Sequence, residues 1–242
     1  MSETSVLDEL RVGGLTLAGI TRGGVETCIM VKELGVMFDV GMCPPGALKF
    51  ATILVSHGHA DHMGGLPYLV SQHGLMSSPP PVIHMPADIV EPTRQILALW
   101  SQIEDFELKA ELHGHQPGDR PRVGQNLNAL ALRTSHRVTS LAWLIERTSH
   151  RLRPEFVGRE PREIATLRAA GEVITDPHTE PLLCVTGDTR IEFFDQHELA
   201  RRCRVLVHGK VVNEDTPNAD GEGWITVTLR HAPQTVLLEW AP

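Results

Sequence analysis

The chain is 242 residues long, 41% of it apolar and 21% charged, with a formal net charge of -8. This composition is ordinary for a soluble globular protein, and the length fits one domain, which we expect to span residues 1–242. No apolar run approaches the roughly 18 residues that a membrane span needs, so we expect no membrane contact. The acidic, polar first residues differ from a secretory signal and favour a cytoplasmic location. The negative charge argues weakly against a nucleic-acid partner, because phosphate is repelled unless a local basic patch compensates.

The first 40 residues have the pattern of a hairpin-rich β-sheet. Short apolar runs over residues 15–20, 27–31 and 36–40 are separated by glycine-containing turns. Asp39 follows the third run, at the end of the predicted strand.

A dense set of metal-ligand residue types follows the apolar run 53–55, which is typical of a buried strand. The set comprises His57, His59, Asp61 and His62. Alternate positions of an extended segment project to the same side, so we expect His57 and His59 to share one ion while Asp61 and His62 turn toward a second. Imidazole and carboxylate are ligands of zinc, manganese or iron, and the absence of thiolate argues against a purely structural zinc site.

Strands and helices then alternate along the chain. We predict a helix over residues 66–73, a buried strand over 82–85 and a second helix from Pro92 to about 103. That helix carries an apolar stripe of Ile96, Leu97, Leu99 and Trp100. His113 and His115 form an HxH pair with polar flanks, which favours a surface loop. The isolated histidines are interpreted as structural or exposed: His73, His84, His150, His178 and His197.

Two later strands deliver further candidate ligands. A predicted strand over residues 127–132 leads to His136, and an apolar strand over 182–185 leads to Gly187 and Asp188. A carboxylate at such a strand end, after a glycine that permits close approach, suits a ligand bridging two metals; an Asx turn is the alternative. Between them, residues 161–170 predict a helix that ends at Gly171, with Ile164 and Leu167 facing inward.

The HxHxDH loop followed by Gly64 and Gly65 resembles the signature of the metallo-β-lactamase superfamily, and its surroundings resemble short-form RNase Z. The resemblance covers about residues 13–208 and implies an α/β fold with four αββα layers. It implies that His136 is the third metal-binding motif and completes the site of His57 and His59. Gly-Asp-Thr matches the fourth motif, which implies that Asp188 bridges the metals. The resemblance implies that Asp39 supports the loop that carries His57, His59, Asp61 and His62 (the metal loop) from behind. A simple turn carboxylate is an equal alternative.

The implied activity is 3′ processing of precursor tRNA by a hydroxide activated between two divalent metals, zinc in the first place, with manganese or iron as alternatives. Asp61 is the candidate general base as well as a ligand. Arginines between the third and fourth motifs would meet phosphate or form a solvated helix face, and both interpretations stay open. They are Arg151, Arg153, Arg159, Arg162 and Arg168. A homodimer is also implied, because this family often dimerises.

The match decays over residues 209–242. Gly209 stands where short RNase Z proteins carry a glutamate, and the last predicted strand is followed by Glu239 rather than by the final metal-binding histidine. Water, Glu239 or His231 would have to fill the second metal position.

Two other functions therefore remain as alternatives. One is a small-molecule hydrolase of the same superfamily that cleaves a thioester, lactone or phosphodiester, which the acidic charge favours. The other is a metal-binding relative that has lost catalysis.

Overall fold

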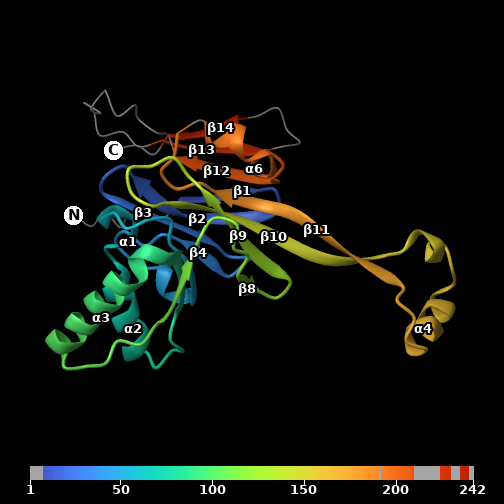
Figure 1. The fold of residues 1–242 in the computed structure, drawn as a ribbon, viewed down its shortest axis with the longest axis horizontal. Coiled ribbons are helices and arrows are strands. Elements are labelled where there is room, and N and C mark those ends of the chain that lie inside the picture. Colours follow the sequence, from blue (N-terminus) through green and yellow to red (C-terminus); the bar gives the residue numbers. More distant parts are fainter. Residues whose placement is uncertain (1–7, 191, 210–223, 230–234, 240–242) are drawn as a thin grey trace.

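The computed structural model describes residues 8–190, 192–209, 224–229 and 235–239. In this part of the chain two β-sheets pack face to face, and helices cover the outer face of each (Figure 1). The arrangement confirms the expected α/β fold with αββα layers.

The first sheet follows the chain order. It contains β1 (Asp8–Val12), β2 (Leu15–Arg22), β3 (Glu26–Val31), β4 (Val36–Phe38), β5 (Thr52–Leu54), β6 (Val82–Pro86) and β7 (Glu111–His115). The strands from β1 to β4 pair antiparallel, as the hairpin pattern predicted, whereas β4 to β7 pair parallel. Ligand sites of parallel sheets lie beyond the carboxyl ends of the strands, and the loop with the candidate ligands leaves β5 at that edge.

The second sheet runs in reverse order through space, from β14 to β8. It contains β8 (Arg122–Gly124), β9 (Leu127–Arg133), β10 (Leu141–Leu152), β11 (Thr175–Val185), β12 (Val205–Gly209), β13 (Trp224–Leu229) and β14 (Thr235–Glu239). Its described pairs are antiparallel apart from β11 and β12, which run parallel. The carboxyl end of β11 therefore brings Asp188 to the edge from which the loop after β5 also emerges.

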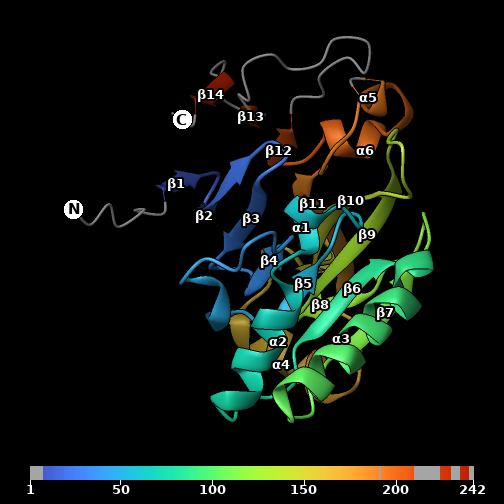
Figure 2. The ribbon, with the colours of Figure 1, turned by 90° about the vertical axis from the view of Figure 1, so that its left-hand side faces the viewer.

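The helices lie outside the two sheets. They are α1 (Ala60–Met63), α2 (Leu66–Leu75), α3 (Val90–Glu104), α4 (Pro161–Ala169), α5 (Phe193–Gln196) and α6 (Glu198–Arg201), with 3-10 turns η1 (Ala47–Lys49), η2 (Ala87–Ile89) and η3 (Pro154–Phe156). Figure 2 shows α2 and α3 beside the first sheet and α5 and α6 beside the second. No helix in the described part of the chain is long and apolar enough to cross a membrane.

The main core lies between the sheets, where alternate residues of both point inward. Phe38 and Trp143 are among its largest fully buried side chains. The indole Nε1 of Trp143 donates to the carbonyl oxygen of Val55 at 3.0 Å, so β10 holds the main chain where β5 passes into the metal loop. A second apolar cluster joins Leu66 and Leu69 of α2 to Ile53 of β5.

The outer parts of β10 and β11 form a long two-stranded arm that projects from the sandwich and carries α4 near its tip (Figure 1). The register of β10 and β11 shifts at Ile145 and Glu146, opposite Pro181, which has no N–H for the ladder. Helix α4 begins at Pro161, and Gly171 follows it with a φ of 81°, both as predicted. Ile164 and Leu167 are the two half-buried residues of α4 and the others are exposed, so these two face inward as predicted, although no residue of the helix is fully buried.

Two expectations failed for related reasons. His113 and His115 lie on strand β7 and not in a loop, because β6 supplies a parallel partner that the polar flanks did not reveal. In the apolar stripe of α3 only Leu97 is buried; the other three side chains are exposed, since only one side of the helix meets the sheet.

Candidate metal centre

The metal loop is held from both sides. The apolar strand β5 lies between β4 and β6, and its continuation brings Ser56 and His57 to the start of β10. There the N–H of Leu141 donates to the carbonyl oxygen of Ser56 at 2.9 Å, and His57 forms an isolated bridge with Ser140. This bridge joins the two sheets and leaves the His57 side chain fully buried.

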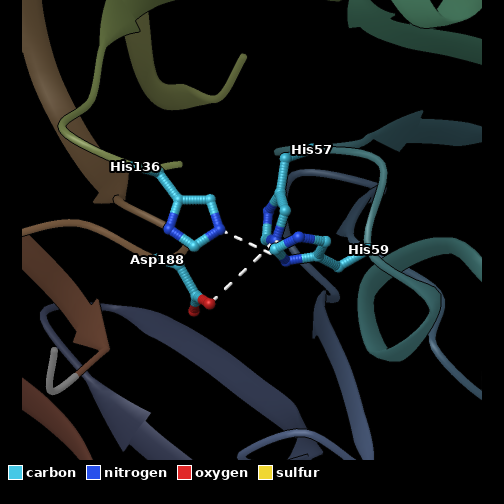
Figure 3. Close-up of side chains that lie close together, drawn as sticks. All are labelled: His57, His59, His136 and Asp188. Carbon is cyan, nitrogen blue, oxygen red and sulfur yellow. Dashed lines mark hydrogen bonds and ion pairs between the residues drawn. The ribbon is translucent and has the colours of Figure 1, made fainter. Parts of the chain in front are cut away.

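Four candidate ligands converge from three loops (Figure 3): His57, His59, His136 and Asp188. One ligand atom from each lies within 4.8 Å of all the others. Nδ1 of His59 is 3.0 Å from Nε2 of His57 and 3.2 Å from Nε2 of His136. Ligands at zinc bond lengths of about 2.0–2.1 Å in a tetrahedron are separated by about 3.3 Å, so the spacing fits one shared ion.

The charge state of this group also fits a metal. Burial, together with the neighbouring His62, His136 and His59, lowers the pKa of His57 to about 2. Its imidazole is therefore neutral at pH 7, which is the form that binds a metal ion. The ring nitrogens of three histidines face one another here. Hydrogen bonds among neutral imidazoles cannot pair all three at once, whereas one cation at the centre can accept a lone pair from each.

Asp188 faces two histidines with its two oxygens. Oδ2 lies 4.0 Å from Nε2 of His57, and Oδ1 lies 3.6 Å from Nε2 of His62. The same Nε2 of His62 is 3.7 Å from Oδ2 of Asp61. Asp61, His62 and Asp188 thus form a second group beside the first, with Asp188 common to both, and each group could hold one divalent ion.

Asp39 orients the loop from behind. Its carboxylate accepts from the N–H and the hydroxyl of Ser56 at 2.7 and 2.9 Å, and it lies 2.8 Å from Nδ1 of His62. Burial opposes the charged form of His62, but Asp39, Asp188 and Asp61 outweigh it and raise its pKa to about 9. Asp39 also has the positive φ of a turn residue, 56°, so both of its alternative roles describe the same side chain.

Ser56 is the residue that sequence reasoning missed. Its hydroxyl lies between Asp39 and Nδ1 of His57, 2.9 Å from the latter. The only signal in the sequence was its position directly before His57, which does not distinguish it from any serine at a strand end.

The loops of His136 and Asp188 are tied together. The N–H of Ser135 donates to Oγ1 of Thr189 at 3.1 Å. Gly187 has a φ of 57°, and a Cβ built on it would lie 2.7 Å from the Cβ of Ser56. A glycine is needed there because the chain passes directly over the metal loop in a left-handed conformation.

Comparison with known proteins gives a consistent assignment. The sequence profile of the Metallo-beta-lactamase superfamily matches residues 27–130. A tRNase Z of Arabidopsis thaliana is 32% identical over 213 residues, which span 87% of this chain and 76% of that protein. A nuclear ribonuclease Z of Triticum aestivum is 31% identical over 170 residues, or 70% of this chain and 97% of the relative. The crystal structure of human tRNase Z, short form, matches with a TM-score of 0.41 and 16% identity over 76% of this chain and 67% of that chain.

The chain belongs to the tRNase Z family of the metallo-β-lactamase superfamily. It is a metal-dependent hydrolase, and the donors of the histidine and aspartate group at the edge of the sandwich fit the divalent metal of this superfamily. Of the residues considered for the second metal position, His231 and the side chain of Glu239 lie outside the described residues.

Proposed function

We propose that this tRNase Z family member removes the 3′ trailer of precursor tRNA, with two zinc ions held in its candidate metal centre. His57, His59, His136 and Asp188 would hold one ion, and Asp61, His62 and Asp188 the other. The observation that carries the proposal is the placement of Asp188, whose two carboxylate oxygens face a histidine of each group. The names of the relatives, tRNase Z and ribonuclease Z, supply the substrate.

The metal ions, when bound, would lower the pKa of a water molecule toward about 7 and polarise the scissile phosphodiester. The protein's own contribution is orientation and proton transfer. Oδ2 of Asp61, which faces Nε2 of His62, accepts from the N–H of Gly24 at 3.0 Å, so the carboxylate is held beside the second group, where it would take a proton from the attacking water. The Asp188 side chain is 44% exposed while that of His62 is 4% exposed, so the substrate would approach from the Asp188 side.

The arm is the candidate RNA-binding element. It projects from the sandwich and carries the five arginines that the sequence suggested as phosphate contacts (Figure 1). Arg153 is paired with Asp176 at 2.8 Å and Arg159 with Glu163 at 2.8 Å. Within the described part of the chain the other three form no ion pair and are exposed: Arg151, Arg162 and Arg168. The protein is acidic overall, so RNA binding requires a local group of positive charges. These three exposed guanidinium groups could contact the RNA phosphates.

The deciding experiment combines metal content with cleavage. The purified chain should contain at least two zinc ions by mass spectrometry and cleave a precursor tRNA so that the tRNA keeps a 3′ hydroxyl. Asp188→Asn should lower the rate at least about 1000-fold, because a metal contributes several kcal/mol and each 1.4 kcal/mol is tenfold. Asp195→Asn removes the same charge from an exposed carboxylate of α5 and should leave the rate unchanged.

Other outcomes would favour the alternatives. Turnover of bis(p-nitrophenyl) phosphate without cleavage or binding of precursor tRNA would favour a small-molecule hydrolase, which the net charge of -8 supports. Bound metal with no turnover of either substrate would point to a relative that has lost catalysis.

A cytoplasmic location and a homodimer complete the proposal. Cell fractionation would test the location. Apolar side chains exposed on α3 support a self-association surface, and light scattering on the purified chain would measure it. They are Ile96, Leu99, Trp100 and Ile103.

A further inference from the structure

A second group of histidines lies on the first sheet, apart from the candidate metal centre. His84 of β6 is directly opposite His113 of β7 in the parallel register, and His115 follows two residues later. Residues two apart on a strand share a face, and neighbouring strands are about 4.8 Å apart, so the three side chains rise from one patch of the sheet. Ile83 and Met85, which flank His84, pack with the helix-facing core, so His84 faces the second sheet.

The rings are already in contact. Nδ1 of His84 lies 2.9 Å from Nε2 of His115, and the rings of His84 and His113 stack with centroids 5.3 Å apart. His84 is only 5% exposed, and its Nε2 is buried without a hydrogen-bond partner among the described residues. The nitrogen that faces His115 is Nδ1, so Nδ1, and not the buried Nε2, is the atom of His84 placed to bind a metal shared with His115.

A carboxylate backs this group as well. Nδ1 of His115 lies 3.6 Å from Oδ2 of Asp119. The loop that carries Asp119 is fixed to β9, because Ala131 donates to the carbonyl oxygen of Asp119 at 2.9 Å and accepts from the N–H of Gly118 at 2.8 Å. A carboxylate beside Nδ1 favours the proton of His115 on that nitrogen and leaves Nε2, which faces His84, able to bind a metal.

The protonation states of these histidines also suit a metal. Burial and the neighbouring His115 and His113 lower the pKa of His84 to about 4. Burial also lowers the pKa of His115, although Asp119 opposes the shift. Both imidazoles are thus neutral near pH 7 and able to donate a lone pair.

We propose that His84, His113 and His115 form an additional binding site for a zinc ion, separate from the candidate metal centre. His84 and His115 are placed as ligands, and His113, whose side chain is 48% exposed, completes the set by rotating its ring away from the stack. Three imidazoles form a recognised zinc ligand set with one open position. The ion would tie the edge strand β7 to β6, next to Trp143, whose ring centroid lies 5.6 Å from that of His115.

The test counts zinc at equilibrium on the full-length protein. The chain is stripped with a chelator, dialysed against buffered free zinc, and measured by mass spectrometry. His113→Ala and His115→Ala should each bind one zinc ion fewer than the unmodified chain, whereas His150→Ala, which removes an exposed histidine of the arm, should bind as many. Asp119→Asn should weaken the same site about 10–100-fold.

A further variant separates the site from a surface histidine pair. His84→Gln should also fail to hold the ion, with circular dichroism and thermal unfolding without metal showing that the variant folds. Equal zinc content in the unmodified chain and His113→Ala would overturn the proposal. Loss of the ion in His113→Ala but full retention in folded His84→Gln would overturn it too, because the ion would then sit on the exposed pair alone. The count does not depend on turnover, so this site can fail while the proposed nuclease function stands, and the reverse.

Discussion

Oδ2 of Asp39 lies 2.8 Å from Nδ1 of His62, and Oδ1 of the same carboxylate accepts from the main chain of Ser56. The contact makes Nδ1 a donor to Asp39, and Nε2, which points to Asp61 and Asp188, is the nitrogen that would give up its proton to bind a metal. One buried carboxylate therefore sets the direction in which the second metal group presents its histidine.

Asp39→Asn should weaken metal binding at the group of Asp61, His62 and Asp188 about 10–100-fold, because the amide neither holds the tautomer nor balances charge as the carboxylate does. Titration of the stripped protein with zinc measures this effect. Asp88→Asn changes an exposed carboxylate in the same way and should leave the affinity unaltered. Equal affinities in the two variants would show that Asp39 is only a turn residue.

Gly187→Ala should lower the free energy of unfolding by more than the strain of its positive φ alone would. A positive φ costs a residue with a side chain about 1–3 kcal/mol, and the added Cβ would also press on Ser56 at 2.7 Å. Gly171→Ala is the matched control, since it has a φ of 81° with no atom within 4 Å. Urea unfolding of both variants gives the difference. If both substitutions reduce the free energy of unfolding equally, the contact between Gly187 and Ser56 does not add to the cost, and the expectation is wrong.

Replacing Arg151, Arg162 and Arg168 by glutamine should weaken binding of precursor tRNA and leave hydrolysis of bis(p-nitrophenyl) phosphate unchanged, because the small diester cannot reach the arm. The slope of log affinity against log salt should become shallower by about 0.7–1 for each phosphate that the arm no longer neutralises. Replacing Lys49, Arg94 and Lys109 removes three positive charges elsewhere and serves as the control. The same weakening in both triple variants would mean that net charge, and not the arm, governs binding.

His84 should make the metal-free fold sensitive to acid. Its pKa is about 4 in the folded chain against an ordinary 6.5, so the unfolded chain binds a proton first as the pH falls. The stabilisation is complete above pH 6.5, declines as the pH falls toward about 4, and amounts to at most about 3 kcal/mol. Urea unfolding across this range, with chelator present, should show a shallower pH dependence for His84→Gln than for the unmodified chain. Parallel curves would contradict the expectation.

The sequence alone predicted the features that depend on near neighbours. The strand before His57 follows from a continuous apolar run, the helix at Pro161 from proline at its first turn, and its end from Gly171. The dense ligand loop could be predicted for the same reason, because its chemistry lies within six consecutive residues.

Features that depend on distant segments required the tertiary structure. Ser56 gained a role only when Asp39 came within hydrogen-bond distance, 17 residues away in the chain. His113 and His115 looked like a surface loop because nothing in their flanks shows that β6 pairs with them and brings His84 to 2.9 Å. Local sequence patterns indicate the backbone preference of a segment and the chemistry of its side chains. Which strand becomes a neighbour is set by sheet order and packing, and that decides where the histidines of this chain meet.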